Sequence, residues 1–285
     1  MHFPISAPRR TAFGALGFVL VSLGMANIAL AEEAGPSTIV PQTRIDPKAP
    51  RNTSPDPRNF EGVWTPRPTQ HVSMKAALGT NGVMATVEGT LPPLNAEAQN
   101  TFYHRLSMEQ LGTPVANTAT TCRPGLAIKA LQLGRPTRVQ QTGDKLFFYL
   151  GTNRVWFVYL NRDHPKNLKP SYMGDSVGHW EGPTLVVDTI GFTDRTWIDL
   201  VGLPHSPDLH IITRINKILN GTALLFLTTI DDPRTYTAPW TTAHVARFTD
   251  DPLEIEADCL ENNRLEGNEE ILFEDGYLQK KGGNS

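Results

Sequence analysis

An aspartate and two histidines are the residues of this chain best suited to move a proton. Asp188 lies in the run 184–190 (TLVVDTI), whose alternation places its carboxyl group on one face with Val186 and Ile190. A carboxylate among aliphatic side chains is costly to bury, and desolvation there makes it a stronger proton acceptor. Asp188 is therefore a candidate general base; the alternative is a structural role, in which it accepts hydrogen bonds that pin the loop beginning at Gly191.

His205 and His210 flank the entrance to the next predicted strand, in which His210 shares a face with Arg214. Histidine exchanges protons near neutral pH, so a histidine close to an aspartate forms an acid–base pair. We predict that Asp188 or Asp194 acts as the base and His205 or His210 as the acid. Each histidine also fits a purely structural role in a hydrogen-bonded loop.

Aromatic residues beside predicted turns are candidates for the wall of a pocket. Trp180, Trp197 and Trp240 lie next to turns or motif loops, where an aromatic side chain often lines a pocket mouth. We expect Trp180 and Trp197 to hold the ring of a substrate. Tyr236, Trp240 and Arg214 are further predicted binding residues, and packing in the core is the alternative for the aromatic ones.

Other kinds of chemistry have weaker signals in the sequence. The residues that a metal could use are His205, His210 and Asp175, or His164 and His179. The His-x4-His spacing is no standard zinc pattern, and no His-Glu-x-x-His is present. Ser176 lacks the Gly-x-Ser-x-Gly context of a hydrolase nucleophile, and no nucleotide-binding glycine pattern occurs. We therefore expect no metal site and no organic cofactor.

The elements that position these residues are predicted to be β-strands. From residue 136 onward, β-branched and aromatic runs alternate with turn residues. We expect strands at 136–142, 145–151, 153–160, 176–180, 184–190, 209–218, 222–230, 240–249 and 253–260. Asn220-Gly221 is the strongest turn signal and predicts a type I′ hairpin. Many hairpin-linked strands indicate an all-β fold, an antiparallel barrel or sandwich, and exclude a parallel α/β sheet. A barrel of this size leaves room for one small ligand.

One helix is predicted before these strands. Asn95 is a good N-cap, and Gly112 ends the pattern. The apolar positions of the helix are Ala98, Phe102 and Leu106, four residues apart. We expect the fold to begin with a short strand at 60–64 and residues 66–91 to form a long loop. The stretch between the helix and the later strands is predicted to be irregular.

The N-terminus has the features of a signal peptide. Arg9 and Arg10 precede an uncharged apolar run from 12 to 31, which ends on the small-x-small pattern Ala29-Leu30-Ala31. We predict cleavage after Ala31, and therefore a periplasmic or secreted protein with no membrane attachment after processing. A single membrane anchor is the alternative. Both the general secretory and the twin-arginine route are open.

Composition divides the rest of the chain and limits its partners. We expect a signal peptide at 1–31, a Pro-rich linker at 32–58, a β-barrel domain at 59–265 and a C-terminal tail at 266–285. The formal charge is −3, and becomes −5 once Arg9 and Arg10 are removed. With no run of Lys or Arg, the chain has no electrostatic footprint for nucleic acid.

Two cysteines remain after processing, Cys122 and Cys259. An even count in an exported chain predicts a disulfide between them. The bond would close a very long loop, for which the loss of chain entropy in the unfolded state is greatest.

One segment carries a family resemblance. Residues 173–197 read MGDSVGHWEGPTLVVDTIGFTDRTW and resemble the pattern MGxSxGxWEGDTLVVDTxGFNDxTW of exported bacterial proteins that are mostly called hypothetical. Further pieces agree in order: Cys122-Arg-Pro-Gly, Pro204-His205-Ser206, Asp231-Asp232-Pro233, Tyr236-Thr-x-Pro-Trp240 and Cys259-x-Glu261-Asn262. The resemblance covers about 120–265. It implies a lipocalin- or calycin-like antiparallel barrel but no general activity, although some relatives look like accessory proteins for the breakdown of aromatic compounds.

The chain departs from this family pattern at four positions. Asp175 stands where His is common, His179 where Arg or Lys is common, Pro183 replaces Asp, and Thr213 stands where Glu is frequent. If the His or the Glu is catalytic in relatives, this protein works differently or lacks that activity.

The leading hypothesis is an exported enzyme without an organic cofactor. It would carry out acid–base elimination, isomerisation or lyase cleavage on a small, partly apolar compound such as an aromatic metabolite. The alternatives are a non-catalytic periplasmic binding protein with the same pocket and a metal-dependent hydrolase. Polar residues that converge inside the barrel favour the enzyme, and an all-apolar lining favours the carrier. The sequence leaves the oligomeric state open.

Overall fold

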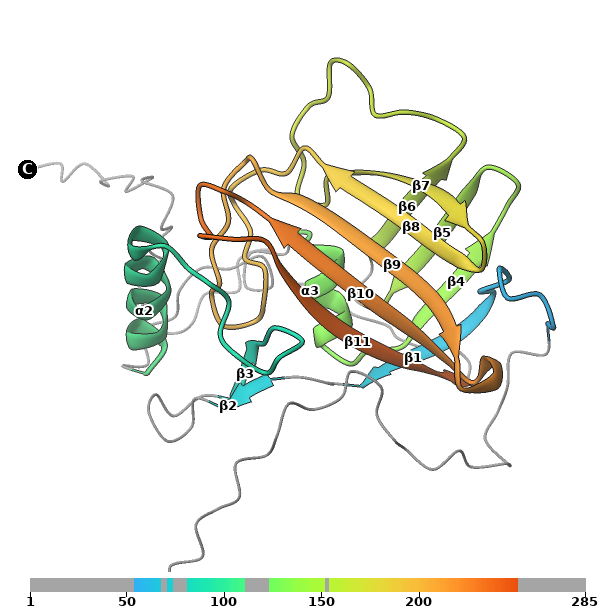
Figure 1. Ribbon diagram of the computed structural model, residues 1–285, viewed down its shortest axis with the longest axis horizontal. Coiled ribbons are helices and arrows are strands. Elements are labelled where there is room, and N and C mark those ends of the chain that lie inside the picture. The colour runs from blue at the N-terminus through green and yellow to red at the C-terminus, as the bar shows by residue number, and fades with distance from the viewer. Residues whose placement is uncertain (1–53, 68–70, 74–80, 111–122, 152–153, 251–285) are drawn as a thin grey trace, which may run out of the picture. The chain divides into compact units, whose positions relative to one another are not determined.

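β-Strands close into a barrel in the computed structural model of this chain (Figure 1). The structure describes residues 54–67, 71–73, 81–110, 123–151 and 154–250. The barrel strands are β1 (Gly62–Arg67), β4 (Thr137–Gln141), β5 (Lys145–Leu150), β6 (Arg154–Leu160), β7 (Asp175–Glu181), β8 (Thr184–Ile190), β9 (His210–Ile218), β10 (Ala223–Asp231) and β11 (Trp240–Thr249). The predicted all-β barrel is confirmed.

Neighbouring strands of the barrel follow the chain from β4 to β11, and β1 closes the ring between β11 and β4. All neighbouring pairs are antiparallel except β6 and β7, which run parallel and pair Tyr159 with Val177 and Leu160 with Gly178. A parallel pair needs a long crossover in place of a hairpin. The loop 161–174 supplies it and returns the chain to the start of β7.

Eight of the predicted strands agree with β4 to β11, and the ninth, at 253–260, lies outside the described residues. The expected two-residue turn at Asn220-Gly221 is wrong in length. Because Ile218 pairs with Ala223, the connection has four residues, 219–222. Positive φ angles occur at Leu219 (52°) as well as at Asn220 (54°) and Gly221 (84°), and this turn includes the 3-10 element η1 (Leu219–Gly221).

The predicted helix is confirmed as α2 (Ala96–Gln110). Its N-cap is Asn95, whose Oδ1 accepts the backbone N–H of Ala98 at 2.9 Å. Phe102 and Leu106 are almost completely buried. The helix therefore forms where the sequence pattern placed it, with its apolar stripe against the rest of the protein.

Three short elements correct the sequence analysis. The stretch expected to be irregular contains α3 (Ala127–Gln132). The expected loop 66–91 contains a two-stranded sheet of β2 (His71–Ser73) and β3 (Asn81–Met84). Elements of three to six residues are too short for a hydrophobic period to appear in the sequence. Tertiary burial stabilises them instead, as for Leu131 on α3, which is 2% exposed.

Two clusters of buried residues form the core. The first fills the barrel and includes Trp64, Phe148, Trp156, Phe226 and Leu131, so that α3 contributes to the barrel interior. The second joins α2 and β3 to the loops after β8 and β10; its largest members are Phe102, Phe192, Tyr236 and Trp240. The first expected strand, 60–64, is shifted to β1, although Phe60 is still buried in the first cluster.

Several predictions fall outside the described residues. The signal peptide at 1–31, most of the linker at 32–58, Cys122, Cys259 and the tail at 266–285 are among them, so they stay predictions. Within the part of the chain that the structure describes, no helix combines the length and apolarity needed to cross a membrane.

Candidate functional site

The barrel interior contains a small cavity next to α3. Its volume is about 20 Å³, enough for about one water molecule. The lining residues include the apolar Ile128, Trp156, Met173 and Phe192 and the hydroxyl-bearing Thr189, Thr213 and Thr228. The cavity therefore has the mixed lining of a ligand site, but in this conformation it is too small for an aromatic metabolite.

Hydroxyl groups inside the barrel form short hydrogen-bonded chains. Trp156 Nε1 donates a hydrogen bond to Ser176 Oγ at 2.8 Å, and this oxygen lies 2.8 Å from Thr189 Oγ1. Thr213 and Thr228 share a hydrogen bond of 3.3 Å. No residue that lines the cavity carries a carboxylate or an imidazole. The cavity can orient a ligand by hydrogen bonds, but the residues that line it hold no group for proton transfer.

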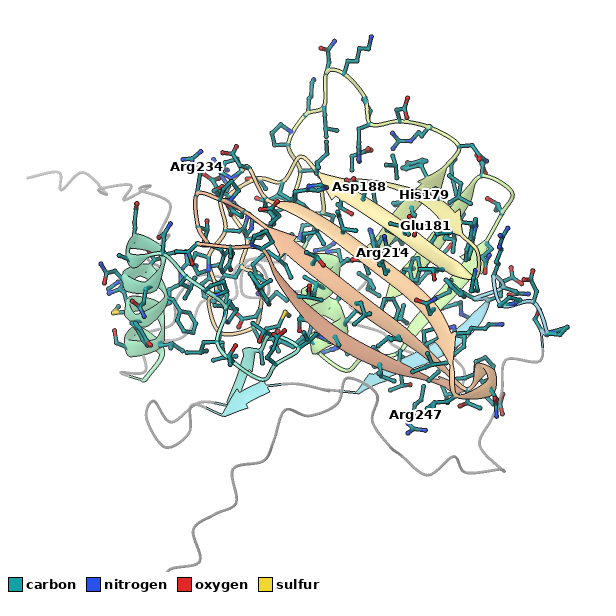
Figure 2. The ribbon with its side chains drawn as sticks, viewed as in Figure 1. His179, Glu181, Asp188, Arg214, Arg234 and Arg247 are labelled. Carbon is teal, nitrogen blue, oxygen red and sulfur yellow. The ribbon has the colours of Figure 1, made fainter. Side chains whose placement is uncertain are left out.

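Asp188 points out of the barrel. Its strand neighbours Val187 and Thr189 are buried in the interior, and alternation along β8 turns Asp188 to the outer face. The carboxyl group is 38% exposed. Figure 2 shows it on β8, on the face that also carries His179, Glu181 and Arg214. Asp188 shares a face with Val186 and Ile190 as predicted, but the expected burial of its carboxylate is wrong, because this face is the outside of the barrel.

Two histidines converge on one oxygen of Asp188. Nε2 of His210, the first residue of β9, lies 3.0 Å from Asp188 Oδ1. Nε2 of His164, in the loop 161–174, lies 3.3 Å from the same oxygen. The other nitrogen of His164 lies 2.7 Å from Asp175 Oδ2, and Arg162 Nη2 donates to Asp175 Oδ1 at 2.5 Å. We call Arg162, His164, Asp175, Asp188 and His210 the Asp188 cluster.

The charge of Asp175 is set by its neighbours Arg162 and His164. Burial raises the pKa of Asp175, but hydrogen bonds from Arg162 and His164 and the charge of Arg162 outweigh it, and the pKa is lowered overall. Asp175 is therefore ionised at neutral pH. It holds Arg162 and His164 in place, because both donate to its two oxygens.

The chain reaches the cluster by a reversal after β6. Asn161 has a φ of 59°, a left-handed conformation that asparagine tolerates. Arg162 then lies over the ring of Tyr159, with its guanidinium carbon 4.0 Å from the ring centroid. The hydrogen bonds of Arg162 and His164 pin this loop to the outer face of the barrel. The cluster thus has a structural role in addition to its candidate chemical one.

Asp194 and His205 belong to a different region. His205 is 7% exposed; its Nε2 accepts from the hydroxyl of Thr196 and its Nδ1 donates to the carbonyl of Ser206 at 3.0 Å. Burial lowers the pKa of His205, although the Ser206 hydrogen bond and the charges of Asp232 and Asp194 act in the opposite direction. The buried ring therefore favours the neutral form, and the structure does not bring His205 or Asp194 to Asp188.

The predicted binding residues Trp180 and Arg214 lie on β7 and β9. Trp180 packs against Phe60 with 5.3 Å between ring centroids. Arg214 forms an exposed ion pair of 2.7 Å with Glu181 on the outer face (Figure 2). Neither side chain forms a pocket wall with Asp188.

The remaining predicted aromatic residues are part of the core beside α2. Tyr236 donates from its hydroxyl to the carbonyl of Pro204 at 2.8 Å and lies 5.5 Å from Trp240. Trp197 packs beneath Arg105, whose guanidinium carbon is 5.0 Å from the indole centroid. The prediction that these rings surround one substrate with Asp188 therefore finds no support in their positions.

Lys129 is a buried charge that the sequence analysis did not single out. The side chain lies on α3, 4% exposed, with Nζ 5.2 Å from the ring of Trp197. Among the described residues, Nζ has no hydrogen-bond partner. Burial lowers the pKa of Lys129 to about 8, with Asp199 raising it and Arg105 lowering it further.

Asp199 is the acidic neighbour of Lys129 and is completely buried. Oδ1 accepts the backbone N–H groups of Val201, Gly202 and Leu203, and Oδ2 accepts that of Met84. Burial raises its pKa in spite of these four hydrogen bonds. The carboxyl group organises the turn 199–203 and, among the described residues, has no hydrogen bond to Lys129.

Of the residues that were not predicted to belong to a site, some have a signal in the sequence and others have none. Asp175 and His164 entered it only as metal-ligand candidates, because the path of the loop 161–174 has no sequence signal. Lys129 had one, a single charge inside the apolar segment Ala-Ile-Lys-Ala-Leu. No group of three or more His, Cys, Asp or Glu side chains within the described ranges is arranged to hold a metal ion.

Comparison with known proteins returns no relative: no family model, no curated protein and no solved structure matches the chain.

Proposed function

We propose that this protein is an enzyme that moves a proton on its substrate at the Asp188 cluster. The single observation that carries the proposal is the convergence of two imidazole Nε2 atoms, from His164 and His210, on one oxygen of Asp188. Acid–base catalysis needs a proton acceptor and a proton donor within reach of one substrate. This cluster supplies two titratable rings around a shared carboxylate.

His210 is the best-placed base of the cluster. Asp188 accepts a hydrogen bond from Nε2–H and thereby fixes the tautomer in which Nδ1 carries a lone pair. The side chain of His210 is 36% exposed, so a substrate can reach that nitrogen. Asp188 thus serves to orient and stabilise the imidazolium, which reverses the roles expected from the sequence, where Asp188 was the base.

His164 complements His210 from the loop side. Both of its ring nitrogens face carboxylate oxygens, Asp175 at 2.7 Å and Asp188 at 3.3 Å, and in the imidazolium form both nitrogens are donors. The side chain is 19% exposed. The proton that His210 takes up at Nδ1 can return from the same atom to a leaving group, while Asp188 stays ionised beside both rings.

The chemistry that such a cluster supports is elimination, isomerisation or lyase cleavage. Each of these reactions removes a proton from carbon and returns one to another atom, and none requires an external oxidant or reductant. An exported protein that acts on compounds from the environment fits this class, and the proposal retains periplasmic or secreted location.

The barrel cavity favours a second candidate, a small-molecule binding protein. Its three threonine hydroxyls lie among apolar walls, the combination that binding sites use for orientation and affinity. A ligand larger than water would require movement of α3, which contributes Ala127, Ile128 and Leu131 to the cavity wall. A metal-dependent hydrolase has no corresponding site among the described residues.

The test is product analysis by mass spectrometry after incubation of the purified mature protein with a panel of carbonyl-containing and aromatic metabolites. Wild type, His210→Ala and His179→Ala are compared, each with and without chelator. His179 lies on the same outer face, is exposed and pairs with Glu181, so it is a matched control. Turnover that survives in His179→Ala and is lost in His210→Ala supports the proposal. Equal turnover in all three proteins contradicts it. If turnover is lost only when chelator is added, the protein is instead a metal-dependent hydrolase.

A further inference from the structure

Four aromatic side chains share the outer face of β5 and β6. Phe147 and Tyr149 are stacked on β5, with ring centroids 6.4 Å apart and planes 19° apart. Phe157 and Tyr159 are stacked on β6 at 6.5 Å and 22°. The two pairs meet where Phe147 pairs with Phe157 across the strands, edge to face at 5.6 Å. We call these four rings the aromatic face.

The aromatic face is partly open to solvent, because Phe157 is exposed and the other three rings are half-buried. Phe157 is 44% exposed, the most exposed large hydrophobic side chain among the described residues. Alternation explains why it points outward, since Trp156 and Val158 on the same strand are buried in the barrel. Cross-strand aromatic pairs stabilise a sheet, but that stabilisation does not require four rings to gather at one solvent-exposed place.

Two cationic side chains lie beside the aromatic face. The Nζ of Lys145 lies 5.4 Å from the ring centroid of Tyr159, and the exposed Arg138 pairs across the strands with Tyr149. Lys145 also forms an exposed ion pair of 3.9 Å with Asp144, in the turn before β5. The outward-facing residues of the three strands themselves are Arg138, Gln140, Lys145, Phe147, Tyr149, Val155, Phe157 and Tyr159, and none is acidic. A ligand on this face therefore meets rings with Arg138 and Lys145 beside them.

The aromatic face continues into the Asp188 cluster. Arg162 joins the two, because its guanidinium group covers Tyr159 at 4.0 Å and bonds Asp175 at 2.5 Å. Across the strands, Tyr159 pairs with Val177 and Val177 pairs with Asp188. A ligand laid along the outer face can thus contact the rings and the acid–base groups at the same time.

We propose that the aromatic face binds a glycan chain that carries carboxylates, a polyuronate, and presents it to the Asp188 cluster. A flat sheet face encloses little of a small molecule, whereas a polymer gains affinity by contacting several rings together. Sugar rings present C–H groups to the negative faces of aromatic rings, and Lys145 and Arg138 match the carboxylates in charge.

This substrate class rests on the proposed function and defines its reaction. His210 takes the proton from the carbon next to a uronate carboxylate. The electron pair of that C–H bond forms a carbon–carbon double bond as the neighbouring glycosidic C–O bond breaks, and the leaving oxygen takes up a proton from the cluster. No other reactant is needed, and one product carries an unsaturated sugar.

Binding is tested by affinity electrophoresis in gels that contain polygalacturonate, alginate or, as the neutral arm, a soluble β-glucan. Phe157→Ala should weaken the binding of a polyuronate by about tenfold or more, in line with the loss of one stacking contact. Tyr103→Ala is the matched control, because Tyr103 is 38% exposed on α2, and it should bind as wild type does. Melting temperatures establish that both variants fold.

The experiments distinguish failure of the proposed binding surface from failure of the proposed reaction. Retardation by polyuronate that Phe157→Ala loses and Tyr103→Ala keeps supports the inference. Equal retardation by β-glucan overturns the assignment to uronates, and no retardation of wild type overturns the inference entirely. Ultraviolet absorbance of the unsaturated product tests the reaction separately. Binding without product in wild type overturns the reaction and leaves the binding surface intact.

Discussion

Nε2 of His210 lies 3.0 Å from Oδ1 of Asp188, and both side chains are more than a third exposed. Among the described residues, Nδ1 of His210 has no hydrogen-bond partner. This geometry orients one nitrogen by a carboxylate and leaves the other to solvent. The arrangement resembles the orientation of a catalytic histidine by an aspartate, with the two ring nitrogens exchanged.

Asp188→Asn separates the proposed catalytic role of this pair from a structural one. The amide keeps the shape of the carboxylate but removes its charge, so it stabilises the imidazolium of His210 less well. We expect turnover to fall by a factor on the order of a hundred or more, with a melting temperature close to that of wild type. Steady-state kinetics and thermal unfolding of the same preparations measure both.

His210→Ala and His164→Ala complete this test. In the proposed mechanism both lose activity, and His164→Ala also loosens the loop 161–174 because its two carboxylate contacts disappear. If all three variants melt early yet keep their specific activity when folded, the Asp188 cluster is only structural.

Asp175 makes the stability of the barrel depend on pH in the acid range. Its pKa is lowered, since the hydrogen bonds and charges of Arg162 and His164 outweigh the effect of burial. A lowered pKa contributes stability that is present above the unfolded-state pKa, near 4, and is lost as pH falls through the lower folded-state value. We expect Asp175→Asn to cost about 1–3 kcal/mol at pH 7 and progressively less below pH 4, as measured by urea unfolding. A cost that does not change with pH contradicts this ion-pair account.

The sequence predicted the strands well because their signals are local. Alternation in the run 184–190 placed Asp188 on the correct face, and turn residues marked the ends of most strands. Which face of a strand points into the barrel depends on how the whole sheet closes on itself. Val187 and Thr189 point inward only because β1 pairs with both β11 and β4, and no local pattern contains that information.

The candidate site could be predicted only in part for the same reason. His210 and Asp188 lie on adjacent strands, so register brings them together. His164 arrives through a long loop whose path depends on tertiary contacts such as Arg162 with Tyr159 and Asp175. His205 lies near His210 in sequence, but its ring is buried beside Phe192 and accepts a hydrogen bond from the hydroxyl of Thr196.

Export predicts a new N-terminus at Glu32. The pattern Ala29-Leu30-Ala31 fits the cleavage site of a signal peptide. Edman sequencing of the protein recovered from the periplasm or the medium of an expressing bacterium should therefore begin Glu-Glu-Ala-Gly. A chain that stays in the membrane fraction with residues 1–31 attached contradicts the prediction and supports an anchor.

The predicted export also leads us to expect a disulfide between Cys122 and Cys259. Both residues lie outside the described part of the chain, so chemistry must decide. Thiol titration of the denatured, unreduced protein should find no free thiol, and the double variant Cys122→Ala/Cys259→Ala should lose about 2–5 kcal/mol of stability. Two titratable thiols per chain would contradict the predicted disulfide.

Lys129 should make the protein more stable as pH rises above neutrality. Its pKa is about 8 in the folded state against 10.5 for an ordinary lysine, so between these two values the unfolded chain binds more protons than the folded one. Stability therefore increases with pH across that window, and below pH 8 the buried ammonium costs about 3 kcal/mol.

Lys129→Met keeps much of the stem and removes the charge, so it should raise the unfolding free energy at pH 7 by up to about that amount. Urea unfolding at pH 7 to 10 of wild type, Lys129→Met and the exposed control Lys169→Met measures the difference. The gap between wild type and Lys129→Met should narrow as pH rises, while Lys169→Met follows wild type throughout. A Lys129→Met variant that is less stable than wild type at pH 7 would mean that the ammonium is paired in solution.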